Sequence, residues 1–232
     1  MAPRRVVLYS RDRMRHSAKR PRLMLADDHQ LVLGGLRSLL EAKFDVIGVA
    51  GDGRSLVRRA ERLKPDIVLL DISMPKLNGI EVARMLSKSL PESKLIFVTM
   101  HADATFVSEA LKAGASGYVI KRAAPEELVA AIDEVWRGRT YITPLVTKGF
   151  VDSVLAPHSS GEPFGRLTER QREVLQLVAE GQSVKETAAT LHIAPKTVEF
   201  HKSNIMRALG LRSTAELVKY AIKHGIASVE DI

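Results

Sequence analysis

The sequence predicts an α/β domain built on a doubly wound, five-stranded parallel sheet, followed by a small all-α domain. Two observations carry this prediction. Residues 23–137 alternate short apolar runs, rich in β-branched residues, with amphipathic stretches, and this alternation is typical of a parallel sheet covered by helices on both faces. From residue 166 onward, residues typical of helix starts and helix ends follow one another, which indicates a group of short helices.

Five apolar runs are the expected strands of the first domain, and they lie at residues 23–26, 46–50, 67–70, 95–99 and 118–120. The stretches between them have helical spacing, as at Leu128, Ala131, Ile132 and Val135, which share one helix face. Ligand sites in doubly wound sheets form at the carboxyl ends of the strands. The residues that follow these runs are therefore the candidates for function.

Acidic, hydroxyl and basic side chains stand at four of the five strand ends: Asp27 and Asp28 after the first, Asp71 after the third, Thr99 ending the fourth and Lys121 after the fifth. Carboxylates gathered at one edge repel each other and raise one another's pKa unless a cation lies among them. Oxygen ligands without Cys or His select a hard ion such as Mg²⁺. A lysine and a threonine hydroxyl beside that ion make a site for a phosphoryl group.

Each of these residues alone has an ordinary structural explanation, such as a helix cap for an aspartate after a strand. Their coincidence at four strand ends favours the functional interpretation. In the stretch DISMPKLNG, residues 71–79, the proline and the Asn-Gly pair predict a turn that leaves Asp71 exposed. For His29 and His101, which adjoin this group, we expect a surface side chain or a local hydrogen bond.

The second domain is expected to contain four helices, at 168–180, 184–191, 195–209 and 214–224. Their start signals are three capping boxes and a proline in a first turn, namely Thr168 with Gln171, Ser183 with Glu186, Ser213 with Glu216, and Pro195. Their end signals are Gly181, Gly210 and Gly225. A short second helix, a turn at HIAP and a longer third helix predict a helix-turn-helix.

The third of these helices has two different faces. A helical wheel places Val198, Ile205 and Leu209 on one face and polar side chains around Phe200 on the other. A phenylalanine exposed among polar groups fits an ordinary solvated surface poorly and favours contact with DNA. The expected DNA contacts are Lys196, Thr197, Glu199, Phe200 and Ser203, with Lys185 and Lys202 placed for phosphates rather than bases.

The composition excludes several classes of protein. The chain has 232 residues, 45% of them hydrophobic, which is enough for one or two domains with a sizeable core. It has no cysteine, so disulfides and thiolate metal sites are excluded, and a reducing cytoplasm fits. No run approaches the roughly 18 to 20 apolar residues of a membrane span, so we expect a soluble, cytoplasmic protein.

The net charge of +8 is concentrated at the start of the chain, because residues 1–22 contain eight Lys/Arg and one acid, whereas 23–145 contain sixteen of each. A solvated, disordered tail is the main interpretation, with polyanion binding and an upstream start artefact as alternatives. The overall charge is therefore weak evidence for DNA binding. Pro, Gly and Ser mark 156–165 as a linker, preceded by a short helix expected at 144–155.

The Asp27-Asp28 pair, DISMPKLNG, VTMHAD and GYVIKRAAPEEL occur in this order on the strand ends, and together they resemble the receiver domain of a two-component response regulator. The stretch LTERQREVLQLVAEGQSVKETAATLHIAPKTVEFHKSNIMRALGL resembles the LuxR-type DNA-binding domain. The chain thus resembles NarL/FixJ-like response regulators. This implies a flavodoxin-like strand order 2-1-3-4-5 and four segments: a basic tail at 1–21, a receiver at 22–140, a linker at 141–165 and a DNA-binding domain at 166–232.

The resemblance implies a role for each acid at the strand ends. Asp71 would accept a phosphoryl group from the phosphohistidine of a sensor histidine kinase. Asp28, Asp71 and the backbone carbonyl of Ser73 would bind Mg²⁺, and Asp27 would act through water. The receiver would catalyse only its own phosphorylation and dephosphorylation, and a homodimer would bind paired promoter half-sites.

The resemblance also implies a switch. Thr99 and Lys121 would contact the phosphoryl oxygens, and Tyr118 matches the aromatic residue that family members reorient on activation. His101 and Ser73 occupy positions that tune the lifetime of the phosphate in the family. The sequence does not set that lifetime.

Two other functions compete with this interpretation. A Mg²⁺-dependent phosphatase or phosphotransferase with an aspartyl-phosphate intermediate needs a second acid two residues after the nucleophile, and Ser73 occupies that position. The sequence contains no G-x-x-x-x-G-K-[ST] or G-x-G-x-x-G stretch for nucleotide phosphates. A constitutive DNA binder that uses its receiver only to dimerise is disfavoured by the complete set of strand-end residues.

Three residues depart from the LuxR-type pattern: Val184 stands where Asn is frequent, Thr187 where Ile is common and Ala194 where a Ser cap is common. The last departure costs a helix cap, about 1 kcal/mol by typical values. None of the three removes the helix pattern.

Overall fold

The structure is a computed structural model, and it describes residues 20–155 and 167–227. Most of the expected basic tail, the Pro/Gly/Ser linker after residue 155 and residues 228–232 lie outside the described residues. Among the helices of these two ranges, none combines the length and the apolar character that a membrane crossing requires.

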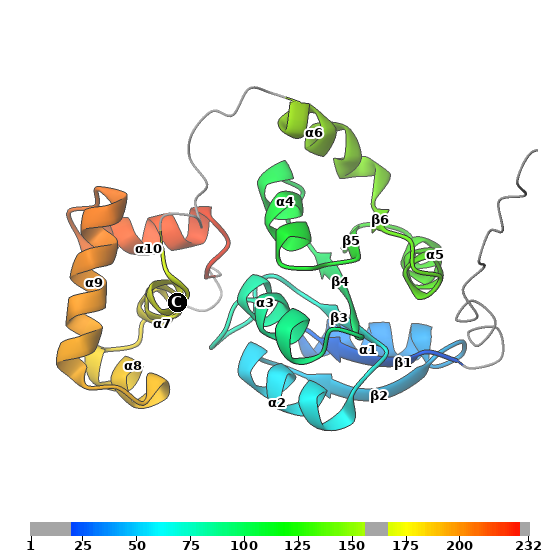
Figure 1. Cartoon of the computed structure of the whole chain (residues 1–232), viewed down its shortest axis with the longest axis horizontal. Helices are drawn as coiled ribbons and strands as arrows, with labels where there is room; N and C mark the ends of the chain where they lie inside the picture. Colours follow the sequence, from blue (N-terminus) through cyan, green and yellow to red (C-terminus); the bar gives the residue numbers. More distant parts are fainter. Residues whose placement is uncertain (1–19, 156–166, 228–232) are drawn as a thin grey trace, which may run out of the picture.

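The first domain is a parallel sheet with the order β2-β1-β3-β4-β5-β6 (Figure 1). Its strands are β1 (Arg22–Ala26), β2 (Asp45–Ala50), β3 (Ile67–Leu70), β4 (Lys94–Thr99), β5 (Gly117–Ile120) and β6 (Tyr141–Ile142). The five expected strands are confirmed to within one residue at each end, and they have the expected order 2-1-3-4-5.

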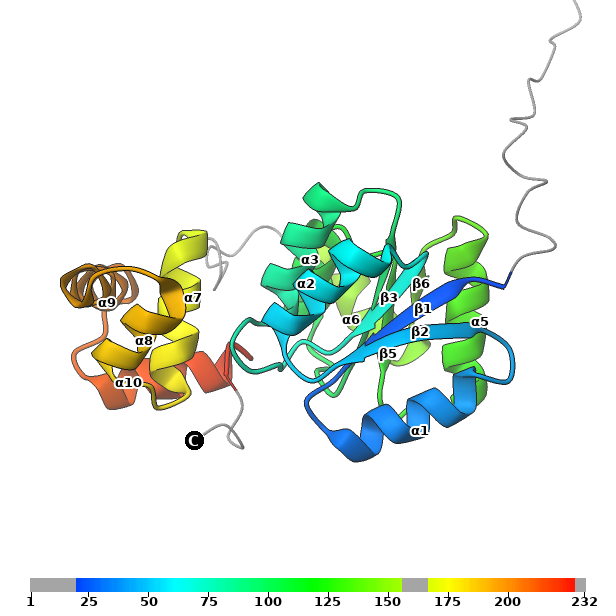
Figure 2. The same cartoon turned by 90° about the horizontal axis from the view of Figure 1, so that it is seen from below.

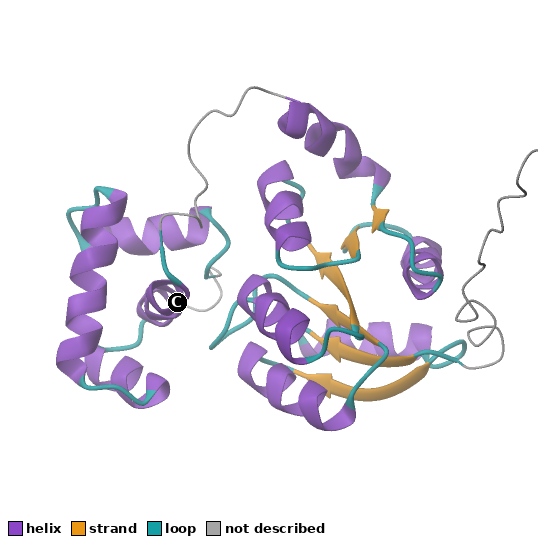
Figure 3. Ribbon diagram, in the orientation of Figure 1, coloured by secondary structure: helices purple, strands orange, loops and turns teal. Residues whose placement is uncertain are grey.

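The expected number of five strands is wrong, because the sheet has six. The sixth strand, β6, contains two residues and pairs with β5 through Gly117↔Tyr141 and Tyr118↔Ile142. Two residues are too few to show any apolar periodicity in a sequence. β6 leads into α6 (Pro144–Leu155), which confirms the helix expected at 144–155 (Figure 3).

Five helices cover the two faces of the sheet (Figures 1 and 2). They are α1 (Gln30–Leu40), α2 (Gly53–Leu63), α3 (Gly79–Ser89), α4 (Ala104–Lys112) and α5 (Pro125–Trp136). Successive residues of a strand point to opposite faces. In β1, Leu23 and Leu25 join a buried cluster with α1 and α5, whereas Met24 and Ala26 join a cluster with α2, α3 and α4. The strands are apolar throughout because both faces are buried.

The segment after α5 is attached to the first domain. α6 packs against α4. The backbone N–H of Thr143 donates to the Tyr118 carbonyl at 2.9 Å, and the Thr143 hydroxyl oxygen accepts from the Ile120 N–H at 3.2 Å. Both bonds tie the start of this segment to β5, the strand that carries Tyr118.

The second domain consists of α7 (Glu169–Ala179), α8 (Val184–Leu191), α9 (Pro195–Leu209) and α10 (Thr214–Lys223), which confirms the four expected helices. The capping boxes at Thr168 and Ser183 are both formed. The third box is incomplete: the Ser213 hydroxyl accepts from Glu216 N–H, but the Glu216 carboxylate accepts from Arg212 N–H instead of Ser213 N–H. Glu216 therefore reaches one residue beyond the N-cap.

The start of α9 lacks a side-chain cap. Ala194 is the N-cap, with extended backbone and no cap hydrogen bond, as the sequence predicts. We expect Ala194→Ser to raise the free energy of unfolding of the second domain by about 0.5 to 2 kcal/mol, because its hydroxyl satisfies one free N–H of the first turn. Urea unfolding followed by circular dichroism measures this change.

Ser183→Ala is the matched control for this prediction, because Ser183 caps α8 and accepts from Glu186 N–H at 3.3 Å. It should lower the stability of the same domain by a similar amount. Loss of stability in Ser183→Ala without any gain in Ala194→Ser would show that the start of α9 does not need a cap.

Candidate functional site

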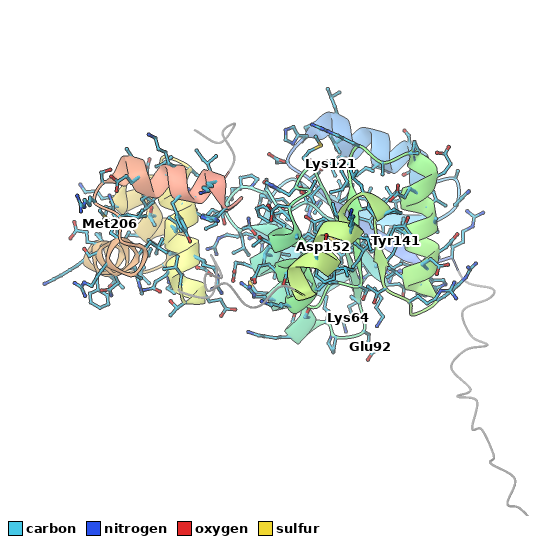
Figure 4. The ribbon with its side chains drawn as sticks, turned by 90° about the horizontal axis from the view of Figure 1, so that it is seen from above. Lys64, Glu92, Lys121, Tyr141, Asp152 and Met206 are labelled. Atoms are coloured by element: carbon cyan, nitrogen blue, oxygen red, sulfur yellow. The ribbon has the colours of Figure 1, made fainter. Side chains whose placement is uncertain are left out.

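The ammonium group of Lys121 lies between two carboxylates at the carboxyl end of the sheet. Its Nζ is 2.6 Å from Asp27 Oδ2 and 2.7 Å from Asp71 Oδ2. The two aspartates are 1% and 5% exposed. Burial disfavours the ammonium ion, but the charges and hydrogen bonds of Asp71 and Asp27 outweigh this effect and raise the pKa of Lys121. Three elements, β1, β3 and β5, thus bring one cation and two anions together, and Figure 4 shows Lys121 within the first domain.

Asp28 and His29 extend this acidic group toward solvent. Burial raises the pKa of Asp28, although His29 opposes the change. The His29 ring nitrogen Nδ1 lies 2.8 Å from Asp28 Oδ1 and 3.3 Å from Asp27 Oδ1. His29 therefore makes local hydrogen bonds, as expected.

The carboxylate oxygens of this group suit a hard cation. Asp27 and Asp28 each place a carboxylate oxygen, and His29 a ring nitrogen, within 4.8 Å of the others. A half-buried carboxylate with a raised pKa gains from a nearby cation, because the cation compensates its lost hydration. Oxygen donors of this kind match Mg²⁺ better than a thiophilic metal.

Asp71 follows β3 directly and is held by its own loop. Its Oδ1 accepts from Ile72 N–H at 2.6 Å. The backbone of Gly79 packs so closely behind it that a Cβ there would lie 2.0 Å from the Asp71 carbonyl oxygen. Only glycine fits this approach of α3 to the strand end.

Two expectations about this loop are wrong. Asp71 is 5% exposed rather than left open by a turn. The Asn-Gly pair does not form a turn: Asn78 is the N-cap of α3, its side chain accepts from Ile80 N–H, and Gly79 is the first helical residue. The left-handed residue of the loop is Lys76, at φ 66°. The loop returns to the strand end before the helix begins, because Gly79 N–H donates to the Ile72 carbonyl at 2.8 Å.

Thr99, His101 and Ser73 form a chain of contacts beside Asp71. Thr99 is fully buried, and its hydroxyl oxygen accepts from His101 N–H at 3.4 Å. His101 Nε2 lies 2.9 Å from the Ser73 hydroxyl. Burial lowers the pKa of His101, with Asp71 opposing. This bond joins residues 28 positions apart, so the expectation of a surface or local role for His101 is wrong.

Tyr118 lies inside the domain. Its side chain is fully buried, and its hydroxyl donates to the His101 carbonyl at 2.8 Å. Burial, followed by the negative charges of Asp71 and Asp103, raises the pKa of Tyr118 above its ordinary value. The Tyr118 hydroxyl is thus uncharged, and it donates a hydrogen bond to the loop that connects β4 with α4.

The second candidate site is the outer face of α9. Figures 1 and 2 place this helix on the side of its domain away from the sheet, and Figure 4 labels Met206 there, far from Lys121. Val198 and Ile205 are buried, whereas Phe200 is 63% exposed and its ring meets His201 edge-on. The other exposed side chains of the expected contact set are Lys185, Lys196, Glu199 and Ser203, while Thr197 and Lys202 are half-buried.

Two family models match the chain. The response regulator receiver domain matches residues 23–133, and the luxR family of bacterial regulatory proteins matches residues 166–221. Transcriptional regulatory protein MctR of Rhizobium johnstonii is 36% identical over 209 residues, covering 89% of this chain and 95% of that protein. Response regulator UvrY of Escherichia coli is 34% identical over 212 residues, covering 90% and 97%.

Solved structures show the same relationship. A LuxR-family two-component response regulator from Aurantimonas sp. has 34% identity and a TM-score of 0.57, covering 60% of this chain and 100% of that one. The response regulator RcsB in complex with DNA has 28% identity and a TM-score of 0.54, covering 87% and 98%.

A parallel sheet with acids and a lysine at its strand ends, joined to a helix-turn-helix domain, is the architecture of a DNA-binding regulator with a receiver domain. The chain belongs to the response regulators that combine a receiver domain with a LuxR-type DNA-binding domain. This family consists of transcriptional regulators and not of classical enzymes.

Proposed function

We propose that this response regulator accepts a phosphoryl group on Asp71 in a Mg²⁺-dependent reaction and thereby controls its sequence-specific binding to DNA. The observation that carries the proposal is the position of Lys121 Nζ, 2.7 Å from Asp71 and 2.6 Å from Asp27. An ammonium among carboxylates at a strand end is the arrangement that a phosphoryl group can enter, because its oxygens replace one anion as the partner of the lysine.

Each strand-end residue has a task in this reaction. Asp28, Asp71 and the Ser73 carbonyl would hold Mg²⁺, and Asp27 would act through water. The bound ion would supply positive charge against the phosphoryl oxygens. A carboxylate oxygen of Asp71 attacks phosphorus, an oxygen–phosphorus bond forms, and the nitrogen–phosphorus bond to the imidazole of a sensor kinase breaks. Lys121 and Thr99 then contact the oxygens of the aspartyl phosphate.

We propose that the receiver accelerates only its own phosphorylation and dephosphorylation. The aspartyl-phosphate enzymes that also use such a fold need a second carboxylate two residues after the nucleophile. Here Ser73 stands at that position, and its hydroxyl contacts His101 rather than the Asp71 carboxylate.

The second step is the switch. The Thr99 hydroxyl oxygen accepts from His101 N–H and can still donate its own proton to a phosphoryl oxygen, so we propose that the loop after β4 follows this hydroxyl when it turns toward the phosphoryl group. A phosphoryl group adds about −1.5 to −2 charges, enough to draw a hydroxyl and a lysine toward it. Tyr118 is bonded to the His101 carbonyl and follows this loop. The surface near α4, β5 and α5 then changes.

The output is DNA binding by α9, on which the exposed face around Phe200 enters the major groove. RcsB, a relative of the same architecture, has been solved as two dimers on two parallel DNAs. We therefore propose that this chain acts in the cytoplasm as a homodimer on paired half-sites, with a sensor histidine kinase as its upstream partner.

Loading of Asp71 should change the mass or the shape of the protein. With Mg²⁺ and beryllofluoride, a mimic of the phosphoryl group, we expect a faster-sedimenting dimer or a more extended monomer, because the mimic moves the loop that carries His101. Sedimentation velocity of wild type and Asp71→Asn measures both quantities. An identical sedimentation profile with and without the mimic would mean that loading does not reorganise the chain.

A further inference from the structure

The DNA-binding domain holds the backbone of the loop that follows the phosphoacceptor. The side-chain oxygen of Gln176, on α7, accepts from Asn78 N–H at 2.6 Å, and its amide nitrogen donates to the Met74 carbonyl at 2.8 Å. Gln176 is 2% exposed. One side chain thus bridges both ends of the loop at 74–78, and it uses its donor and its acceptor to do so.

A second side chain, at the C-cap of α7, contacts the middle of the same loop. Glu180 lies one turn after Gln176, so the two share a helix face. Its Oε1 accepts from Lys76 N–H at 3.0 Å and from the Gln176 amide at 2.7 Å. Lys76 is the left-handed residue of the loop, where a free N–H is otherwise left to water. Three backbone groups of the loop are therefore bound by α7.

A separate contact with the first domain is made by Gly225, which follows α10. The Asn78 side chain donates to the Gly225 carbonyl, after α10, at 2.6 Å. A Cβ on Gly225 would lie 2.6 Å from the Phe106 ring and 3.2 Å from the His101 ring. The His101 ring in turn bonds Ser73. The DNA-binding domain thus contacts two residues that adjoin Ser73. Gln176 binds Met74, the next residue in the chain, and Gly225 contacts His101, whose ring is hydrogen-bonded to Ser73.

These contacts restrain the two loops that are proposed to move when Asp71 is phosphorylated. They do not involve α9, the helix proposed to read DNA. Ser73 supplies a proposed metal ligand, and His101 N–H donates to the Thr99 hydroxyl that is proposed to turn toward a phosphoryl group. The docked surface consists of α7 and the end of α10, whereas α9 lies on the opposite side of the domain (Figures 1 and 2). The interface therefore includes the phosphoacceptor loop, together with α2 and α3 through the pairs Arg54–Glu173 and Arg172–Glu81, and leaves the recognition helix outside it.

We propose that Gln176 of the DNA-binding domain is a positioning residue for the phosphoacceptor loop, and that its grip on Met74 and Asn78 opposes the loading of Asp71. This rests on the proposed function of Asp71. A contact made in only one of two states shifts the balance toward that state. The Gln176 contacts and the binding of a phosphoryl mimic at Asp71 affect each other reciprocally. A chain that loses the Gln176 contacts therefore binds the mimic more tightly.

Two substitutions disrupt the hydrogen bonds of Gln176 with the loop and keep good helix formers on α7. Gln176→Ala removes both hydrogen bonds to the loop. Gln176→Glu keeps an acceptor for Asn78 N–H but faces the Met74 carbonyl and the Glu180 carboxylate with a negative charge. Both substitutions should raise the affinity of the chain for the phosphoryl mimic. Lys88→Ala is the matched control, because Lys88 joins the domains through an exposed pair with Glu169 at 3.5 Å and touches no loop backbone.

The test has two readouts in the full chain. Hydrogen exchange followed by mass spectrometry should show faster exchange of peptides that cover 73–80 in Gln176→Ala and Gln176→Glu, with no change in β1 or β3. Titration with beryllofluoride at saturating Mg²⁺, followed by fluorine NMR, should show affinity raised by about fivefold or more in both variants. Lys88→Ala should match wild type in both measurements.

Unchanged exchange and unchanged affinity in the Gln176 variants, with normal loading of wild type, would overturn the inference alone. Lower affinity in these variants would overturn it as well, since the grip would then favour loading. A wild-type chain that binds no beryllofluoride would overturn the proposed function and this inference together.

Discussion

Acetyl phosphate in the presence of Mg²⁺ should add the mass of one phosphoryl group to the wild-type chain and nothing to Asp71→Asn. The reason is geometric, since the Asp71 carboxylate lies 2.7 Å from the ammonium of Lys121 and beside the acidic group at Asp27 and Asp28. An amide is a poor nucleophile and cannot form the acyl phosphate. Intact-protein mass spectrometry measures the fraction loaded.

Asp45→Asn is the matched control for this prediction, because Asp45 is an exposed aspartate at the start of β2, at the opposite edge of the sheet from the strand end that precedes Asp71. It should load like wild type. Chelation of Mg²⁺ should abolish loading of every variant. Equal labelling of wild type and Asp71→Asn would place the acceptor elsewhere and end the hypothesis.

Glu199→Ala and Phe200→Ala should each weaken binding to the preferred DNA site by about 1 to 3 kcal/mol and change binding to random DNA little. Both side chains are exposed on the outer face of α9. Glu199 can accept from a cytosine amino group, and Phe200 can touch a thymine methyl. Fluorescence anisotropy on specific and random duplexes measures the ratio of the two affinities.

Lys202→Ala belongs to a different class, because a phosphate contact carries no sequence information. It should weaken binding to both duplexes alike and lower the salt slope by about one ion. Glu61→Ala, on an exposed part of α2, should change neither affinity. If Glu199→Ala and Phe200→Ala leave the affinity ratio at its wild-type value, α9 does not read bases through this face.

The sequence predicts most of this fold because its signals are local. The strands are continuous apolar runs, since both sheet faces are buried. In the second domain, α7, α8 and α10 have side-chain caps, and glycines follow α7, α9 and α10. The convergence of Asp27, Asp71 and Lys121 also follows from the sequence, because parallel strands end at one edge. Thus five of the six strands and the acid-lysine group were predictable from pattern alone.

The remaining features depend on contacts between distant segments. β6 has two residues and becomes a strand only because β5 offers an unpaired edge. The bond between His101 and Ser73, and the grip of Gln176 on Met74, join residues 28 and 102 positions apart, and no local period marks them. The burial of Asp71 likewise involves a distant segment, since the Lys121 side chain, 50 positions away, lies against its carboxylate.

The most direct test of a phosphorylation-controlled regulator is DNA affinity with and without the mimic. Anisotropy titrations of a specific duplex should be run on wild type and Asp71→Asn, each with Mg²⁺ alone and with Mg²⁺ plus beryllofluoride. The proposal predicts that beryllofluoride changes the affinity of wild type and leaves that of Asp71→Asn unchanged. The same affinity for wild type in both conditions, with the mimic shown to be bound, would contradict it.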